Sequence, residues 1–188
     1  AQGAPYIDLD GAGDYLIRTD ETDLDVLGTE TIYAAATRGL TVGGLFWFDV
    51  LGADATCMAK FNSTGNQRSL LINNDAGDVI NGFVSADGSA LTAIAGPTVA
   101  VSAWFFCVLR FDPSAELAIF VNGTWARNTT AIPASVFSST AGLEVGSRGG
   151  GTVALLNGRA ACCFMCAQYL SDGIVSALFE AARGMFGL

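Results

Sequence analysis

One stretch in the middle of the chain constrains the fold more than any other feature. Ala103–Gly123 reads AWFFCVLRFDPSAELAIFVNG and joins two strand-like runs through turn-forming residues. Trp104–Phe111 is rich in aromatic and β-branched residues, Asp112–Ala115 has the composition of a turn, and Leu117–Val121 alternates between larger and smaller apolar side chains. Asn122-Gly123 then favours a second tight turn. Together these signals predict an antiparallel meander in an all-β protein.

The alternating apolar residues predict one core between two antiparallel sheets, because strand alternation requires one buried face. The residues expected at its centre are Trp47, Trp104, Phe106, Val108, Leu117, Ile119 and Val121. A chain of 188 residues can bury roughly 70% of its unfolded surface, so such a core needs no disulfide support. We therefore expect residues 1–188 to form a single domain.

The order of these segments resembles the concanavalin A-like, laminin-G-like jelly-roll domains. Beside the central meander, Tyr6–Leu16 resembles the opening hairpin of that family and Leu40–Phe48 its first long core strand. Leu143–Gly146 and Leu156–Gly158 resemble the segments that close the sandwich, and Tyr169–Asp172 the segment after the last strand. The resemblance implies an antiparallel two-sheet jelly-roll sandwich; it implies no particular activity.

A short helix is predicted after this sandwich. Ser171 is a suitable N-cap and Gly184 a suitable C-terminal residue. The apolar stripe between them consists of Ile174, Val175, Leu178, Phe179 and Ala182. We expect the helix to pack with this stripe on the edge of the sandwich.

Charge and hydropathy exclude several classes of partner. The chain has 9 basic and 18 acidic residues, for a formal charge of −9, and so lacks the basic surface that nucleic acids require. No apolar run reaches the roughly 20 residues that cross a bilayer. Charged residues make up only 14% of the chain, and Lys60 is the only lysine. A surface this poor in charge predicts that part of the exterior is covered.

Catalytic patterns are missing from the sequence. Histidine is absent, which rules out a Ser-His-Asp or Cys-His system, and Gly149–Gly151 is better interpreted as a flexible turn than as a phosphate loop. The family that the chain resembles includes glucanases, whose catalysis needs two closely spaced glutamates with an aspartate between them. Glu21 and Asp23 begin that spacing, but the next glutamate is Glu30. We therefore predict a protein that is not an enzyme.

The five cysteines are Cys57, Cys107, Cys162, Cys163 and Cys166. Their odd number and their clustering in one strand-like run favour reduced thiols over a disulfide framework. Strand alternation places Cys163 on one face and Cys162 and Cys166 on the other, whereas zinc requires four converging ligands. We expect no bound transition metal.

Two acidic segments are candidate calcium sites, because related lectin-like sandwiches often carry calcium. The candidate ligands are Asp10 and Asp14 near the start of the chain, and Asp75 and Asp78 in a later turn. Calcium needs several converging oxygens, which spacing alone does not show. Solvated turns and a hairpin turn are the alternative explanations. No other cofactor is indicated.

Association with other subunits is predicted from apolar segments that a sandwich does not need. Ala160–Ala167 is apolar in both alternating directions and has Ala161 and Cys162 where the family typically has an acidic pair. The apolar insertion around Thr31–Arg38 suits either a contact or a local flap over the core. The interface candidates are Ile32, Tyr33, Arg38, Met185, Phe186 and Leu188.

Two functions are compatible with these observations. The first is a homo-oligomeric decoration or cement subunit on the surface of a phage-like virion, held by copies of itself and other subunits. The alternative is a carbohydrate-binding, lectin-like adhesion module, extracellular or at a cell surface and with or without calcium. In that case Tyr33 and Trp125 are the candidates for stacking on sugars.

Overall fold

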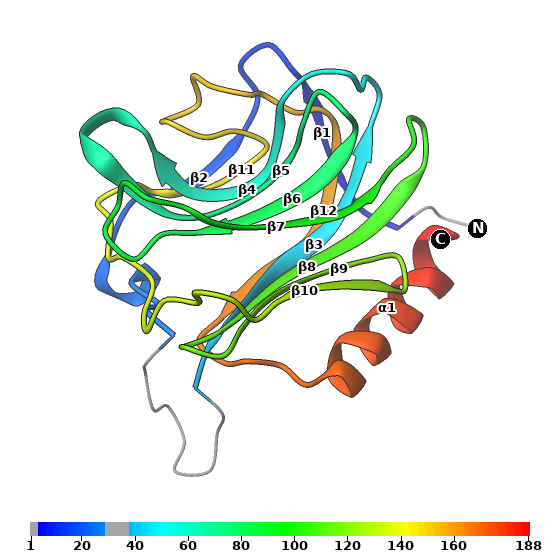
Figure 1. The fold of residues 1–188 in the computed structure, drawn as a ribbon. Coiled ribbons are helices and arrows are strands. Elements are labelled where there is room, and N and C mark those ends of the chain that lie inside the picture. Colours follow the sequence, from blue (N-terminus) through cyan, green and yellow to red (C-terminus); the bar gives the residue numbers. More distant parts are fainter. Residues whose placement is uncertain (1–3, 29–37) are drawn as a thin grey trace.

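A computed structural model describes residues 4–28 and 38–188. Two six-stranded antiparallel sheets pack face to face, and one helix lies outside them (Figure 1). From edge to edge, sheet I consists of β1 (Ile7–Asp10), β12 (Asn157–Cys166), β3 (Leu40–Phe48), β8 (Trp104–Asp112), β9 (Glu116–Val121) and β10 (Thr124–Asn128). Sheet II consists of β2 (Leu16–Arg18), β11 (Leu143–Val145), β4 (Ala55–Asn62), β5 (Gln67–Asn74), β6 (Val79–Val84) and β7 (Thr92–Thr98). Two 3-10 turns, Thr22–Leu24 and Thr64–Asn66, and the helix α1 (Asp172–Phe186) complete the elements.

The predicted jelly-roll sandwich is confirmed, and the central meander is formed by β8, β9 and β10. Asn122 and Gly123 connect β9 to β10 with φ angles of 45° and 92°, which suits a tight hairpin turn. The expected opening hairpin is wrong: β1 pairs with β12 in sheet I, whereas β2 pairs with β11 in sheet II. The first two strands therefore belong to opposite layers.

The face assignment along β8 also differs from the expectation. Leu117, Ile119 and Val121 of β9 lie in the core between the sheets, as predicted. Phe106 and Val108 instead lie on the outer face of sheet I, and the residues of β8 in the inter-sheet core are Phe105, Cys107, Leu109 and Phe111. Trp104 lies half-buried on that outer face, with Trp47 beside it. Both faces of β8 are covered, so its apolar pattern does not distinguish them.

The helix α1 covers the outer face of sheet I rather than the edge of the sandwich (Figure 1). Its N-cap is Ser171, as predicted, with Oγ accepting a hydrogen bond from the Ile174 N–H at 3.4 Å. The helix continues past Gly184 and ends at Phe186, where Gly187 adopts a left-handed φ of 72°. Val175 and Ala182 are buried.

The rest of the expected helical stripe is exposed more than predicted. Ile174 and Leu178 are among the exposed large hydrophobic residues, and Phe179 is half-buried against Phe106 and Phe120. The stripe that contacts the sheet is therefore narrower than the apolar pattern of the sequence.

Other parts of the same chain cover both apolar faces of β12. Cys163 packs toward the inter-sheet core, whereas Ala161 and Phe164 pack under α1. A β-bulge interrupts the pairing with β3 between Ala161 and Phe164, and Cys162 sits in this bulge with a φ of 50° and an exposed side chain. The predicted alternation of the three cysteines is therefore wrong for Cys162.

All five cysteines are free thiols. Cys57 and Cys107 are fully buried in the inter-sheet core, and burial raises the pKa of both thiols. Burial also raises the pKa of Cys163, to about 12. These thiols are therefore protonated and poorly reactive at neutral pH.

Two buried charged groups fix loops around sheet II. The side chain of Lys60, 2% exposed, donates hydrogen bonds to Asp20 Oδ1 at 2.6 Å and to the carbonyl oxygens of Ser139 and Ala141. The buried carboxylate of Glu144 accepts hydrogen bonds from the N–H groups of Gly150 and Gly151 at 2.8 and 2.9 Å. The glycine-rich segment is therefore an anchored loop.

Candidate functional site

A row of polar and aromatic side chains crosses four neighbouring strands on the outer face of sheet I. The register places Asp8 of β1 opposite Arg159 of β12, Arg159 opposite Trp47 of β3, and Trp47 opposite Trp104 of β8. The row lies on the same side as α1, because Trp104 packs against Phe186 with ring centroids 4.8 Å apart. Strand pairing thus brings together residues from the two ends and the middle of the chain.

Arg159 lies between two aromatic rings at this position. Its guanidinium carbon is 5.2 Å from the ring centroid of Tyr6 and 4.7 Å from that of Trp47, both within cation–π range. Trp104 supports both rings edge-on, with centroids 5.8 Å from Tyr6 and 5.9 Å from Trp47. We call Tyr6, Asp8, Trp47, Asp49 and Arg159 the aromatic platform.

The platform is open to solvent and contains unused hydrogen-bonding capacity. The exposed fractions are 51% for Tyr6, 28% for the Arg159 side chain and 74% for the Asp8 side chain. Within the described part of the chain, Tyr6 is the one aromatic residue among the exposed large hydrophobic side chains. Asp49 Oδ1 accepts a hydrogen bond from Trp47 Nε1 at 2.8 Å, and Asp8 Oδ1 lies 3.3 Å from Arg159 Nε.

A hollow of about 230 Å³ lies next to Tyr6. Its walls are Pro5, Tyr6, Ile7, Ala160, Ala161 and Cys162. An aromatic ring beside a shallow apolar hollow, with carboxylates and a guanidinium around it, can hold the apolar face of a sugar and hydrogen-bond its hydroxyls.

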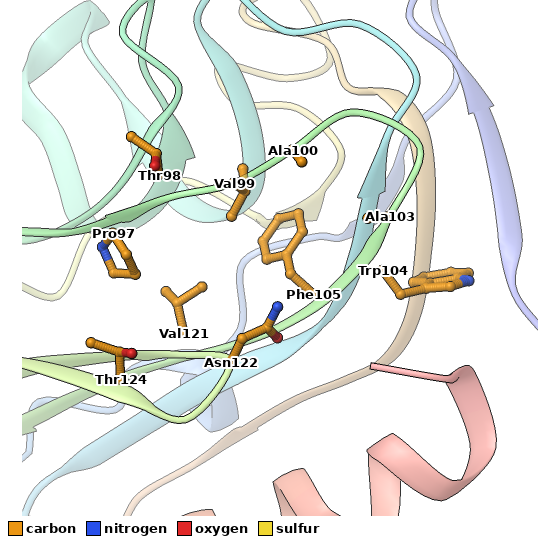
Figure 2. A pocket seen from close by; sticks show the side chains of 10 residues that line it. All are labelled: Pro97, Thr98, Val99, Ala100, Ala103, Trp104, Phe105, Val121, Asn122 and Thr124. Atoms are coloured by element: carbon orange, nitrogen blue, oxygen red, sulfur yellow. The ribbon is translucent and has the colours of Figure 1, made fainter.

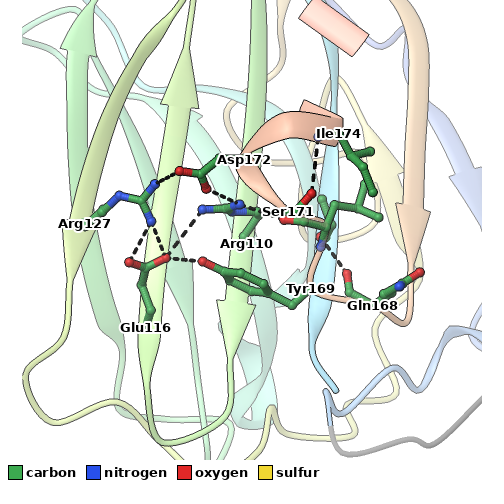
Figure 3. Close-up of polar contacts among 10 residues, drawn as sticks. Arg110, Glu116, Arg127, Gln168, Tyr169, Ser171, Asp172 and Ile174 are labelled. Atoms are coloured by element: carbon green, nitrogen blue, oxygen red, sulfur yellow. Dashed lines mark hydrogen bonds and ion pairs between the residues drawn. The ribbon is translucent and has the colours of Figure 1, made fainter. Parts of the chain in front are cut away.

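A second cluster on the same face consists of paired charges and holds the first turn of α1 (Figure 3). Arg110 is 0% exposed and lies 3.8 Å from the ring centroid of Trp125 and 4.3 Å from that of Tyr169. Its Nη1 is 2.8 Å from Asp172 Oδ1 and donates to the Leu170 carbonyl at 2.7 Å.

The remaining charges of this cluster are paired with one another. Arg127 donates to both oxygens of Glu116 at 2.7 and 2.8 Å and to Asp172 at 2.7 Å. Burial acts to raise the pKa of Glu116, but hydrogen bonds from Arg127 and Tyr169 hold it below its usual value. Burial and the hydrogen bond to Glu116 raise the pKa of Tyr169 to about 12. These pairings stabilise the fold and leave no free acid or base in the cluster.

The sugar-stacking residues expected from the sequence are not those of the platform. Trp125 is half-buried, with Arg110 over its ring, Arg127 4.7 Å from its centroid and Phe120 packed against it at 4.9 Å. Its ring therefore packs against the buried guanidinium of Arg110. Tyr33 lies outside the described residues.

The interface candidates are spread over different environments. Phe186 and Leu188 pack against the cluster between α1 and sheet I, whereas Met185 and Arg38 are exposed. Ile32 lies outside the described residues. The apolar tail and the two-sided β12, which suggested a subunit contact, are thus largely accounted for by packing within the chain.

Three of the four calcium candidates have side chains that accept hydrogen bonds from backbone N–H groups. Asp75 Oδ1 accepts hydrogen bonds from the N–H groups of Gly77 and Val79, at 2.8 and 3.1 Å, and Oδ2 accepts one from Asn81. These bonds lower the pKa of Asp75. Asp10 and Asp78 likewise accept backbone N–H groups, at 2.7 Å each.

Asp14 is exposed. Over residues 4–28 and 38–188, no three Asp, Glu or Cys side chains are grouped so that they could hold a metal ion. The hydrogen bonds of Asp10 and Asp75 fit the turn interpretation, and calcium binding stays a prediction.

Another hollow opens between the two sheets, where β7 and the β9–β10 turn approach each other (Figure 2). It has a volume of about 280 Å³, and its lining includes Phe105, Val121 and Asn122. Asn122 Oδ1 already accepts a hydrogen bond from the Phe106 N–H. The ring of Trp104 points away from this hollow (Figure 2). The hydroxyl groups of Thr98 and Thr124 are the other polar side-chain groups of its lining.

Sequence reasoning placed Trp47 in the core and did not select Tyr6 or Arg159. The alternation of Leu40–Phe48 gives no sign of which face carries Trp47, because both faces of β3 are largely apolar. Asp8 lies in the expected opening hairpin and Arg159 directly after the segment Leu156–Gly158; the two become neighbours only when β1 and β12 pair.

No family model and no curated protein matches the sequence. Solved structures match the fold instead. A heptameric SAP-like pentraxin from Limulus polyphemus superposes with a TM-score of 0.60 and 16% identity over 77% of this chain and 70% of the pentraxin. The CBM40 of the Ruminococcus gnavus IT-sialidase, solved with α2,3-sialyllactose, gives 0.62 and 16% identity over 77% of this chain and 84% of the module.

Botulinum neurotoxin type C, which depends on two ganglioside molecules to enter cells, gives a TM-score of 0.61 and 12% identity. The match covers 89% of this chain but only 39% of the toxin chain.

No helix in the described residues is long and apolar enough to span a membrane. The superpositions show that the chain has a concanavalin A-like jelly-roll fold, similar to this pentraxin and this CBM40.

Proposed function

We propose that this protein is a non-catalytic, lectin-like module that binds a glycan on the aromatic platform. The observation that carries the proposal is the solvent-exposed ring of Tyr6, which lies beside Trp47 and Arg159 in a row fixed by strand pairing. Aromatic rings pack against the C–H face of a pyranose, while the charged groups around them bond its hydroxyls.

The fold supports this proposal by analogy. One structural neighbour was solved with sialyllactose and another is a toxin that interacts with gangliosides. Fold alone does not determine function, so the proposal depends on the platform. The decoration-subunit interpretation depended in part on apolar segments. Of these, Phe164, Phe186 and Leu188 pack between α1 and sheet I, whereas Met185 stays exposed.

We further propose an extracellular or cell-surface location, where glycans are displayed. Free cysteines are unusual in oxidising compartments. In this chain Cys57 and Cys107 are shielded in the core, and burial raises their pKa values. These two core thiols tolerate an oxidising environment because the reactive thiolate form is suppressed, whereas the exposed thiol of Cys162 is open to oxidation there.

The proposal is tested by screening the purified protein on a glycan microarray and measuring the best ligand by calorimetry. Tyr6→Ala is expected to weaken binding at least about tenfold, or about 1.4 kcal/mol. Tyr15→Ala is the matched control, because the Tyr15 hydroxyl lies next to Gly150, away from the platform. Circular dichroism checks that both variants fold. Absence of binding to any glycan, or equal affinity for wild type and Tyr6→Ala, refutes the proposal.

A further inference from the structure

Negative charge surrounds the one cation of the aromatic platform. Asp8 lies opposite Arg159 in the register, and Asp10 lies opposite Asn157 one row further along β12. Asp49 follows β3 and its N–H bonds the Asn157 carbonyl at 3.0 Å. Three exposed carboxylates therefore lie at the same end of β12 as Arg159, and Asp8 pairs with its guanidinium at 3.3 Å.

These carboxylates determine which ligand groups fit. An ionised carboxylate only accepts hydrogen bonds, so it binds the hydroxyl donors of a sugar well and repels another anion. The chain as a whole carries a formal charge of −9, which adds a long-range repulsion for anionic ligands. Arg159 offers one positive charge against three carboxylates, and its Nε already pairs with Asp8 at 3.3 Å.

We infer that the ligand of the aromatic platform is a glycan without anionic groups, bound through hydroxyl donors to Asp8 and Asp49; this inference rests on the proposed function. Sialylated, sulfated and uronic-acid sugars are rejected at this site. The platform then differs in ligand class from the CBM40 neighbour, which was solved with a sialylated sugar.

The test compares glycans that differ only in charge. Lactose against 3′-sialyllactose and neutral against sulfated N-acetyllactosamine are matched pairs for calorimetry, within a wider neutral panel that supplies the best-bound sugar. The neutral member of each pair is expected to bind at least about tenfold more tightly at low salt. Raising the salt concentration is expected to narrow that ratio, since exposed charges are screened.

Variants assign the selectivity to the carboxylates. Asp8→Asn combined with Asp49→Asn is expected to reduce the neutral-to-anionic ratio at least about threefold while both residues retain an accepting oxygen. Asp23→Asn is the control, because the Asp23 side chain is 80% exposed and pairs with Arg18 away from the platform.

The outcomes separate this inference from the proposed function. Tighter binding of the anionic members, lost in Tyr6→Ala, overturns the inference and leaves the glycan-binding function standing. An unchanged ratio in the double variant also overturns it. Failure of every glycan to bind refutes both. If anionic glycans bind, and this binding survives Tyr6→Ala but is lost in Arg68→Ala, the binding site lies on sheet II, where Arg68 lies over Phe61. That result overturns both the inference and the platform as the binding site.

Discussion

Replacing Arg110 with methionine is expected to destabilise the protein strongly, because this buried side chain connects sheet I to α1. Arg110 is 0% exposed, and it donates to the Leu170 carbonyl at 2.7 Å and pairs with Asp172 at 2.8 Å. Glu116 lies further away, at 3.5 Å. Methionine retains the apolar contact between the two flanking rings, so the change mainly removes charge and hydrogen bonds.

The magnitude follows from the number of well-formed interactions. Breaking a buried ion pair by removing one partner costs about 3–5 kcal/mol. Arg127 continues to pair with both carboxylates, which places the expected loss near the lower bound of about 3 kcal/mol. Arg127→Met serves as the comparison. Its side chain is 35% exposed, so its removal is expected to cost about 1–2 kcal/mol.

Urea unfolding at pH 7, followed by far-ultraviolet circular dichroism, measures both losses from the midpoints and slopes. The reasoning is refuted if Arg110→Met costs less than about 1 kcal/mol, or if Arg127→Met costs more than Arg110→Met. A folded variant with lost helical signal places the damage at α1, because α1 is the one α-helix of the described chain.

Three further perturbations test other parts of the account. Hydrogen bonds and neighbouring arginines hold the pKa values of Glu116 and Asp172 below their unfolded values, against the effect of burial. The stabilisation from these two carboxylates is therefore complete above about pH 5 and is lost as pH falls through the folded pKa values. Urea unfolding midpoints should accordingly drop between about pH 5 and pH 3. Gly158→Ala should prevent folding or cost more than about 3 kcal/mol, because its Cβ would lie 1.8 Å from a backbone oxygen of β3; unaltered thermal unfolding contradicts this close approach. Cys162 should react with a thiol reagent in the native protein while the two buried core cysteines react only after unfolding, and a stoichiometry above three before unfolding argues against this burial.

The sequence was sufficient to predict the sandwich because its turns and strands are locally encoded. The β8–β9–β10 meander and β3 appear almost as expected, since aromatic and β-branched runs bounded by Asp-Pro or Asn-Gly specify both strand and turn. The pairing partner of a short strand is not locally encoded. Tyr6–Leu16 accordingly contributes to two sheets rather than one hairpin.

The direction of side chains was predicted poorly wherever a strand is covered on both sides. β8 carries large residues in both alternating sets, and only the position of α1 shows that Phe106 faces the helix and Phe105 the other sheet. The bulge at Cys162 adds a local shift that no composition rule indicates. The platform was missed for a different reason: Tyr6 and Arg159 become neighbours only through the long-range pairing of β1 with β12.

The three tryptophans provide the most direct test of the central claim, that a glycan binds on the aromatic platform. Two-dimensional NMR resolves the indole N–H signals of Trp47, Trp104 and Trp125 during a titration with the best-bound neutral glycan. We expect the Trp47 signal to shift with saturating behaviour, because Trp47 lies in the platform. The Trp125 signal is expected to stay unchanged, because Arg110 covers its ring. A shift at Trp125 alone, or binding measured by calorimetry with no shift at Trp47, would contradict it.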